Sequence, residues 1–307
     1  MTRPVLPPGN TLLVRSFDGT QLHTRVFGPD DGYPIVLAHG ITCAIEVWAH
    51  EIADLARDHK VIAFDHRGHG LSEAPRGREG YSLNHLAADL DAVLDATLAP
   101  GQRAVIAGHS MGGIAISAWS ERYPHRVAQC ADAVALINTT TGDLVRDIQL
   151  AKVPPALAAT RIRGAGTLLK TIGAAPVPKL AGRANKRLVA HLAVGHDADP
   201  SVAELVYQLF AATPPAARAG WARVLVDGLG AQHISLRNLT VPTMVIGSRE
   251  DRLLPINASR HIAEHAPNLA EFVELSGGHC SILERPDEVN SKLRWLAESV
   301  GRQRLSS

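Results

Sequence analysis

The chain has 307 residues, of which 46% are hydrophobic, 20% charged and 4% aromatic, and its formal net charge is +1. A chain with almost no net charge and few aromatic side chains has neither the basic field nor the stacking platforms that nucleic-acid binding requires, so this class is excluded. The length suits one large domain that carries an insertion.

Strand and helix patterns alternate along the first half of the chain. The alternating runs Leu12–Phe17 and Gln21–Phe27, joined by Asp18-Gly19-Thr20, predict a hairpin. Further strands are predicted at residues 34–38, 61–64, 103–107 and 133–137, with helices around residues 48–57, 83–98 and 114–122. Because this alternation is typical of parallel strands joined by crossover helices, we expect an α/β fold with a mostly parallel central sheet.

The segment Gly108-His109-Ser110-Met111-Gly112-Gly113 lies between a predicted strand and a predicted helix. A reversal this sharp strains the serine backbone and brings neighbouring main chain close, so it requires small residues two before and two after the serine. Gly108 and Gly112 meet this requirement, which makes Ser110 the candidate nucleophile; a simple glycine turn is the alternative interpretation. The glycine spacing does not match G-x-G-x-x-G, so no dinucleotide cofactor is expected.

A serine nucleophile needs a histidine base and a carboxylate that orients the imidazole. His279 follows a strand predicted at residues 272–275, and two glycines before it allow the loop to return across the sheet edge. It is therefore the candidate base. Asp251 follows a strand predicted at residues 242–247 and is the candidate acid, with its neighbour Glu250 as a competitor.

His66 and His69 have a spacing that can place two imidazoles on one metal ion, but no third ligand with suitable spacing accompanies them. We therefore expect no metal there. His39 and His109 are likewise interpreted as packed, hydrogen-bonded residues.

Neither export nor membrane insertion is indicated. Prolines within the first eight residues interrupt the apolar helix that a signal peptide needs, and the apolar stretch 104–120 is explained by the strand, turn and helix around Ser110. Three widely separated cysteines predict neither a disulfide framework nor a zinc site and favour a reducing cytoplasm: Cys43, Cys130 and Cys280.

Between Asn138 and about Gln232 the alternation gives way to Ala-rich helical segments, too long for a plain connection. We interpret residues 139–232 as an inserted helical cap between two core segments, 1–138 and 233–307. From Ile148 to His196 there is no Asp or Glu, and the cationic residues are Lys152, Arg161, Arg163, Lys170, Lys179, Arg183, Lys186 and Arg187. This run is either a solvated outer face of the cap or a surface that docks anionic lipid interfaces or acidic acyl substrates.

Together these segments resemble the α/β-hydrolase-fold serine hydrolases, close to small bacterial esterases and cofactor-free haloperoxidases. The resemblance covers nearly the whole chain and rests on the Ser110 turn, the acid and histidine loops, their order Ser110, Asp251, His279, the pair His39-Gly40 and the segment Asp65–Ser72. It implies that the backbone N–H groups of Ile41 and Met111 form an oxyanion hole, and that the cap lies over the nucleophile. Related haloperoxidases often have an aromatic residue at the position of Ile41, so this chain departs from that subgroup here.

The predicted activity is hydrolysis of a carboxylic ester with an apolar acyl group, through an acyl-enzyme on Ser110. A haloperoxidase or perhydrolase uses the same residues with peroxide in place of water, and a carbon-carbon bond hydrolase or an acyltransferase is also open. A ligand-binding module on the same fold is the alternative from another class. The expected partner is a small-molecule ester or acyl substrate, and no cofactor is expected.

Overall fold

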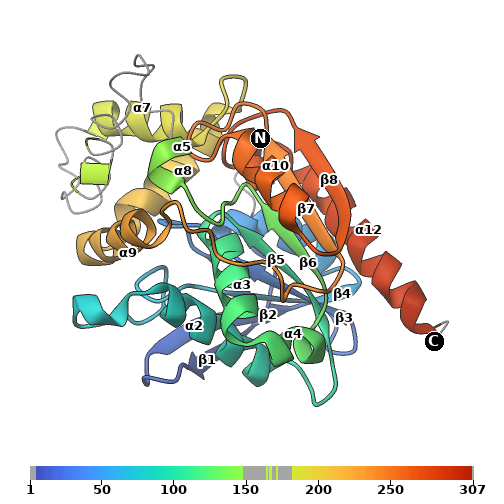
Figure 1. Cartoon of the computed structure of the whole chain (residues 1–307). Coiled ribbons are helices and arrows are strands. Elements are labelled where there is room, and N and C mark those ends of the chain that lie inside the picture. The colour runs from blue at the N-terminus through green and yellow to red at the C-terminus, as the bar shows by residue number, and fades with distance from the viewer. Residues whose placement is uncertain (1–4, 148–163, 165, 168–170, 172–181, 306–307) are drawn as a thin grey trace.

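The computed structural model describes residues 5–147, 164, 166, 167, 171 and 182–305. Within these residues an eight-stranded sheet has the strand order β1-β2-β4-β3-β5-β6-β7-β8. β2 pairs antiparallel with β1 and with β4, whereas the remaining neighbours are parallel. The predicted mostly parallel sheet is therefore confirmed, with an antiparallel hairpin at one edge (Figure 1).

The strands are β1 (Asn10–Arg15), β2 (Gln21–Phe27), β3 (Tyr33–Ala38), β4 (His59–Phe64), β5 (Ala104–His109), β6 (Ala131–Ile137), β7 (Thr243–Ser248) and β8 (Leu269–Leu275). The described α-helices are α1 (Ala49–Leu55), α2 (Leu83–Thr97), α3 (Met111–Arg122), α4 (Pro124–Cys130), α5 (Leu144–Asp147), α7 (Gly182–Ala193), α8 (Pro200–Ala212), α9 (Pro215–Gly228), α10 (Ile256–His265), α11 (Ser281–Glu284) and α12 (Pro286–Leu305). Two 3₁₀ helices are η1 (Ile45–Trp48) and η2 (Arg78–Gly80).

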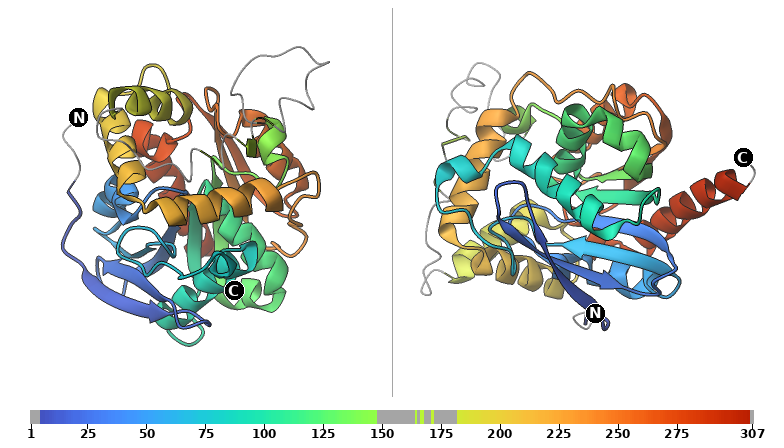
Figure 2. Two further views of the ribbon diagram at one scale, coloured as in Figure 1. Left: turned by 90° about the vertical axis from the view of Figure 1, so that its left-hand side faces the viewer. Right: turned by 90° about the horizontal axis from the view of Figure 1, so that it is seen from below.

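Helices cover both faces of the sheet (Figure 2). α2, α3 and α10 contribute to the hydrophobic core on one face, and α1 and α12 contribute to the core on the other. β5 and β6 are buried along their whole length and are apolar runs because both of their faces are covered. The carboxyl ends of the parallel strands meet at one edge of the sheet, and the loops after β3, β5, β7 and β8 therefore lie near one another.

The helices match the predicted pattern with two differences. The helix expected around residues 48–57 is preceded by η1 and ends at Leu55. α4 follows α3 directly and has no strong periodic signal in the sequence. Pro124 stands in its first turn, where the missing N–H group would have no intrahelical partner in any case.

α5, α7, α8 and α9 lie between β6 and β7 in the chain and gather on one side of the sheet (Figure 1). α8 begins with a capping interaction in which the Asp199 side chain accepts a hydrogen bond from the Ser201 N–H group. The interpretation of residues 139–232 as a separate cap unit stays a prediction. Among the described residues, no helix combines the length and the apolar character that a membrane span would need.

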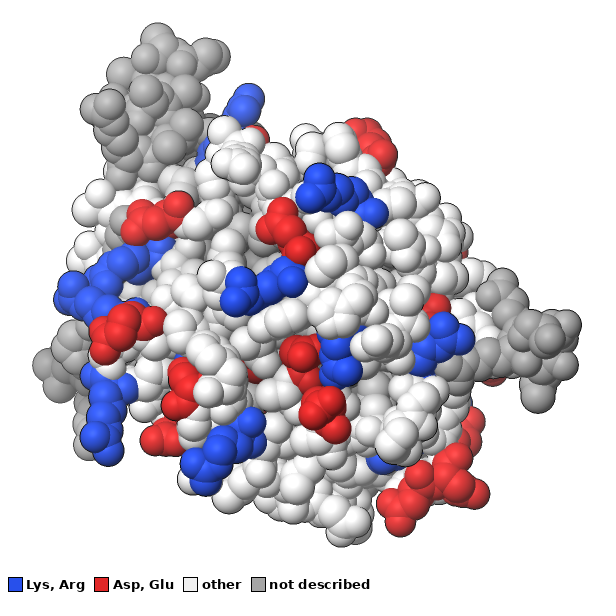
Figure 3. Space-filling view, turned by 60° about the horizontal axis from the view of Figure 1, so that its bottom comes forward, with Lys and Arg blue, Asp and Glu red and all other residues white. Residues whose placement is uncertain are grey.

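Charged side chains of both signs are interspersed on the face that Figure 3 shows. Part of the predicted basic run lies outside the described residues: Lys152, Arg161, Arg163, Lys170, Lys179 and the side chain of Arg183. Lys186 on α7 forms an ion pair with Glu204 on α8, and Arg187 is exposed. A lipid-docking role of this run therefore stays a prediction.

Glu51 on α1 is a buried carboxyl group whose two side-chain oxygens accept no hydrogen bond from any described residue. Burial, followed by the nearby Asp54 charge, raises its pKa well above the usual value. A raised pKa in the folded state adds stability below the pKa of the unfolded chain, and this contribution is lost as the pH rises. We expect Glu51→Gln to stabilise the protein by about 1–3 kcal/mol near pH 8 and by much less near pH 5.

Urea unfolding at these two pH values measures this effect. Glu46, which is exposed in the adjacent η1, provides the matched control, and Glu46→Gln should change stability little at either pH. An equal gain from Glu51→Gln at both pH values would contradict the titration argument.

Candidate active site

Ser110 stands between β5 and α3 in a strained backbone conformation, with φ 51° and ψ −117°. Its N–H group donates to the Ile137 carbonyl at 2.9 Å. A Cβ atom on Gly112 would lie 2.0 Å from the Ala38 carbonyl oxygen, and one on Gly108 would lie 2.4 Å from the Gly112 backbone carbon. A side chain at either glycine would therefore force α3 away from the sheet, which explains the small residues on both sides of Ser110.

Asp251 and His279 are brought together by the loops after β7 and β8. His279 Nδ1 donates to Asp251 Oδ2 at 2.7 Å, and both residues are buried. The other carboxylate oxygen, Oδ1, accepts the backbone N–H groups of Leu253 and Leu254 at 2.9 and 2.8 Å. Because the carboxylate holds the proton on Nδ1, the lone pair of the neutral imidazole is on Nε2.

Glu250, the competing acid in the sequence, has a different partner. Its Oε2 atom lies 3.2 Å from His196 Nδ1 and accepts the His196 backbone N–H group at 3.3 Å. The side-chain hydrogen bond to His196 is the main cause that lowers the pKa of Glu250. Of the two neighbouring carboxylates, the structure places Asp251 against His279.

His109 binds the backbone of the loop that carries His279. Its Nε2 atom donates to the backbone carbonyl of His279 at 2.9 Å, and the two ring centroids are 5.0 Å apart. Burial, followed by the proximity of His279, lowers the pKa of His109 to about 3. His109 is therefore neutral and fixes the backbone that carries His279.

The histidines of the segment after β4 fix the loop after β3. His66 Nε2 donates to the His39 carbonyl at 3.0 Å, and His69 Nε2 accepts the Thr42 N–H group at 2.9 Å. Burial is the main cause that lowers the pKa of His66 to about 3 and that of His69 to about 4. Thr42 has a positive φ of 58°, so this hydrogen bond holds a strained turn beside Ile41.

Asn138, at the end of β6, is a residue of the site that the sequence marked only as a boundary of the insertion. Its Nδ2 group donates to Asp251 Oδ2 and to Ser248 Oγ, both at 3.0 Å, and its Oδ1 atom accepts from Ser281 Oγ at 2.6 Å. Its φ of 43° lies in the left-handed region, which asparagine tolerates. A single sequence does not reveal a positive φ, so Asn138 could not be predicted as a residue of the site.

We expect Asn138→Gly to lower kcat by about 10-fold with KM nearly unchanged, because glycine keeps the backbone conformation while Asp251 loses a buried donor, a loss of about 1–3 kcal/mol. Steady-state ester hydrolysis, measured well below the unfolding temperature, tests this. Asn268→Ala is the control, since Asn268 is exposed and its side chain bonds only the Thr240 carbonyl among described groups. Unchanged kcat in Asn138→Gly would remove Asn138 from the site.

The residues expected to supply the oxyanion hole lie beside Ser110. Met111 is the first residue of α3, where backbone N–H groups have no intrahelical partner. Gly40 packs so closely that a Cβ atom on it would lie 3.1 Å from Ser110 Cβ, and Ile41 follows it directly. Ile41 and Ser110 line the same cavity.

This cavity has a volume of about 210 Å³ and is lined by strand-end loops on one side and by α7, α8 and α9 on the other. Ser110 and His279 both line it, with mostly aliphatic side chains around them. Arg218 on α9 also reaches it, with its guanidinium 4.5 Å from the centre of the Phe210 ring. No sequence pattern predicted Arg218 as a residue of the cavity, because it lies within an Ala-rich helix. Cys43 lines the cavity as a neutral thiol, since burial raises its pKa to about 12.

Comparisons with known proteins agree with this architecture. A family model described as alpha/beta hydrolase fold matches residues 33–286. The putative carbamate hydrolase RutD of Variovorax paradoxus is 29% identical over 280 residues, which cover 90% of this chain and 96% of that protein. The non-heme chloroperoxidase of Burkholderia pyrrocinia is 26% identical over 249 residues, which cover 79% of this chain and 83% of that one.

Among solved structures, the esterase RhEst1 from a Rhodococcus species superposes with a TM-score of 0.74 at 26% identity, covering 94% of this chain and 99% of that one. Because the family model matches more than half of its length, the chain belongs to the alpha/beta hydrolase fold family. The predicted resemblance to esterases and cofactor-free haloperoxidases of this fold is confirmed. The catalytic roles of individual residues are proposals.

Proposed function

We propose that the protein hydrolyses small carboxylic esters with an apolar acyl group, through an acyl-enzyme on Ser110. The observation that carries the proposal is the buried pair of Asp251 and His279, joined at 2.7 Å, beside a cavity that Ser110 also lines. A strained serine at a strand-to-helix turn, a histidine and an oriented carboxylate are the groups that acyl transfer needs. A ligand-binding module without catalytic activity would not require this combination of residues.

In the proposed mechanism, Ser110 Oγ attacks the ester carbonyl as His279 Nε2 accepts its proton. The N–H groups of Ile41 and Met111 donate to the oxygen that becomes negatively charged, and Asp251 stabilises the imidazolium. His279 then gives its proton to the leaving alcohol, so that the acyl group remains on Ser110. Water attacks this acyl-enzyme with His279 again as the base, which releases the acid and restores the serine.

The cavity supports a small acyl group. A volume of about 210 Å³ is below the roughly 300–1,000 Å³ that drug-sized ligands occupy, and the lining is mostly aliphatic. The chain is similar to an esterase and to a putative carbamate hydrolase, and this supports the proposal that it cleaves an acyl-heteroatom bond. We infer that esters with short, uncharged acyl groups fit this space best.

A panel of p-nitrophenyl esters of increasing acyl length, with a lactone and an aryl carbamate as competing substrates, tests the proposal. We expect the highest kcat/KM with the shortest acyl chains, and labelling of Ser110 by a fluorophosphonate probe. Failure to turn over any ester, together with absence of labelling, would favour the non-catalytic binding module.

Perhydrolysis is the second candidate, because non-heme chloroperoxidases are among the relatives. In this reaction hydrogen peroxide replaces water in the attack on the acyl-enzyme and releases a peracid. Incubation with acetate and hydrogen peroxide, with detection of peracetic acid, separates the two activities. Ester hydrolysis without peracid formation would limit the function to hydrolysis.

A further inference from the structure

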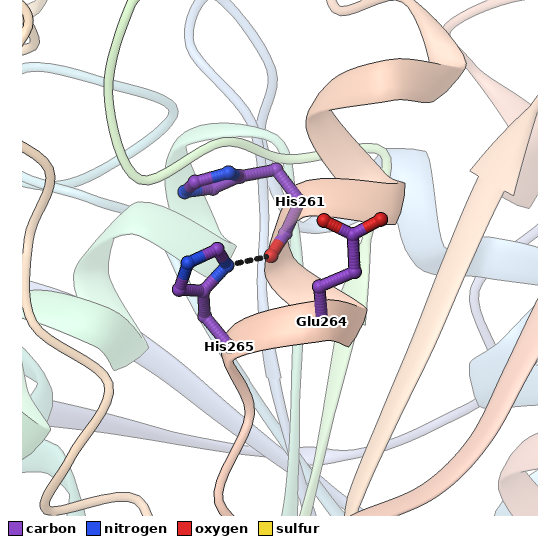
Figure 4. Close-up of side chains that lie close together, drawn as sticks. All are labelled: His261, Glu264 and His265. Carbon is purple, nitrogen blue, oxygen red and sulfur yellow. Dashed lines mark hydrogen bonds between the residues drawn. The ribbon is translucent and has the colours of Figure 1, made fainter.

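A cluster of three side chains that could bind a metal ion lies on α10, away from the cavity. His261 and His265 are four residues apart and therefore share one face of the helix, and Glu264 lies next to them. One ligand atom from each of the three side chains lies within 4.8 Å of the others. Figure 4 shows the two imidazoles one above the other at the end of the helix, with the Glu264 carboxylate set apart from them across the His261 main chain.

The nitrogen atoms of this cluster are suited to bind a cation. His265 Nδ1 donates to the His261 carbonyl at 2.8 Å, so the lone pair of the neutral ring is on Nε2. The His261 ring packs against two other imidazoles in a tilted arrangement, with centroids 4.1 Å from His265 and 4.2 Å from His233.

His233 belongs to the segment after α9 and holds His261 in place. Its Nδ1 atom lies 2.8 Å from Thr141 Oγ1, and its Nε2 atom lies 3.6 Å from Asp143 Oδ2. These contacts anchor the His233 ring to the loop after β6, and its stacking then restricts the His261 side chain. Three elements far apart in the sequence thus meet at the cluster.

We propose that His261, Glu264 and His265 form a surface site for a divalent transition-metal ion of the zinc type. Two imidazoles and one carboxylate are a common ligand set for Zn²⁺, and a water molecule completes a tetrahedral arrangement. Bond lengths of about 2.1 Å place neighbouring ligand atoms roughly 3.4 Å apart, so the Glu264 and His265 side chains must rotate toward His261 to close the site. Glu264 and His265 are exposed, so solvent leaves room for these rotations, which require the contact between the His261 and His265 rings to open.

The position on the helix favours a cation. His265 is the last residue of α10, where the helix dipole presents partial negative charge. The cluster lies at the opposite end of α10 from Leu254, which precedes the helix and lines the cavity. A ten-residue helix is about 15 Å long, so the bound ion would act on stability and not as a reactant at Ser110.

Isothermal titration of the EDTA-treated 307-residue protein with ZnCl₂ tests this proposal. We expect about one equivalent of Zn²⁺ to bind, with Kd in the micromolar range, and the unfolding temperature to rise with Zn²⁺ concentration. The double variant His261→Ala/His265→Ala should weaken binding at least about 10-fold and remove the thermal shift, and Glu264→Gln should weaken binding less. His125→Ala, at an exposed histidine on α4, is the control and should bind as the wild type does.

Equal Zn²⁺ binding by the wild type and the double variant would overturn the proposal, as would no binding by the wild type at about 1 mM Zn²⁺. If the double variant does not fold, the single variants His265→Gln and Glu264→Gln provide the same comparison. Ester hydrolysis is recorded in parallel, and we expect it to be retained in the EDTA-treated protein and in these variants.

Discussion

Ser110→Ala is expected to reduce hydrolysis of short p-nitrophenyl esters by about a thousandfold or more while the protein remains folded. The reason is that alanine removes the oxygen that would form the acyl-enzyme, whereas the hydrogen bond from the backbone of residue 110 to Ile137 does not depend on the side chain. The residual rate reports what the oxyanion donors and substrate binding achieve alone. Initial rates with p-nitrophenyl acetate, combined with fluorophosphonate labelling, measure the loss.

Ser291→Ala serves as the matched control, since Ser291 is an exposed serine on α12. It should retain both full activity and labelling. Thermal unfolding of all three proteins separates loss of chemistry from loss of fold. Turnover by Ser110→Ala near the wild-type rate would show that another group carries the reaction.

Asp251→Asn is expected to lower kcat by about 10³–10⁴-fold, the scale seen when the orienting carboxylate of a serine triad becomes an amide. An amide in this place can turn its NH₂ group toward His279 Nδ1, which favours the tautomer with the proton on Nε2 and removes the base. Asn138 adds to the loss of activity, because its Nδ2 group donates to Asp251 Oδ2 at 3.0 Å. In the variant this group would face the NH₂ group of the new asparagine, and two donors cannot bond each other. Steady-state kinetics across a range of pH values measure the change.

Glu250→Gln is the control with the same chemical change one residue away. Because Glu250 contacts His196 and not His279, we expect the kcat of Glu250→Gln to remain within about twofold of the wild-type value. If Glu250→Gln lost activity as severely as Asp251→Asn, the assignment of the acid would be wrong. Burst-phase measurements then show whether acylation or deacylation is slowed.

The sequence predicted most of the fold because strand and helix periods are separated by clear turn residues. Strand-end positions also selected Ser110 and His279, since parallel strands deliver their following loops to one edge of the sheet. The sequence favoured Asp251 over Glu250 as the candidate acid, and the structure adds the contacts that each carboxylate makes. Which of two adjacent carboxylates points toward His279 depends on the path of the loop. The backbone N–H groups of Leu253 and Leu254 fix the orientation of the Asp251 carboxylate by donating to it.

Contacts between distant segments could not be predicted. Asn138 lies 113 positions from Asp251, and nothing in the local sequence pairs the two. Arg218 reaches the cavity only because α9 packs beside the strand-end loops, and single-sequence patterns do not specify such packing. On α10 the four-residue spacing of His261 and His265 is readable from the sequence, but the stacking of His233 on His261 is a tertiary contact.

The loop after β7 performs two tasks with the same residues. Leu253 and Leu254 hold the Asp251 carboxylate through their main-chain amides, while their side chains form part of the cavity wall. A substrate that presses on this wall therefore pushes on the support of the imidazole as well. A change of side-chain size at Leu253 or Leu254 is therefore expected to alter turnover together with substrate preference.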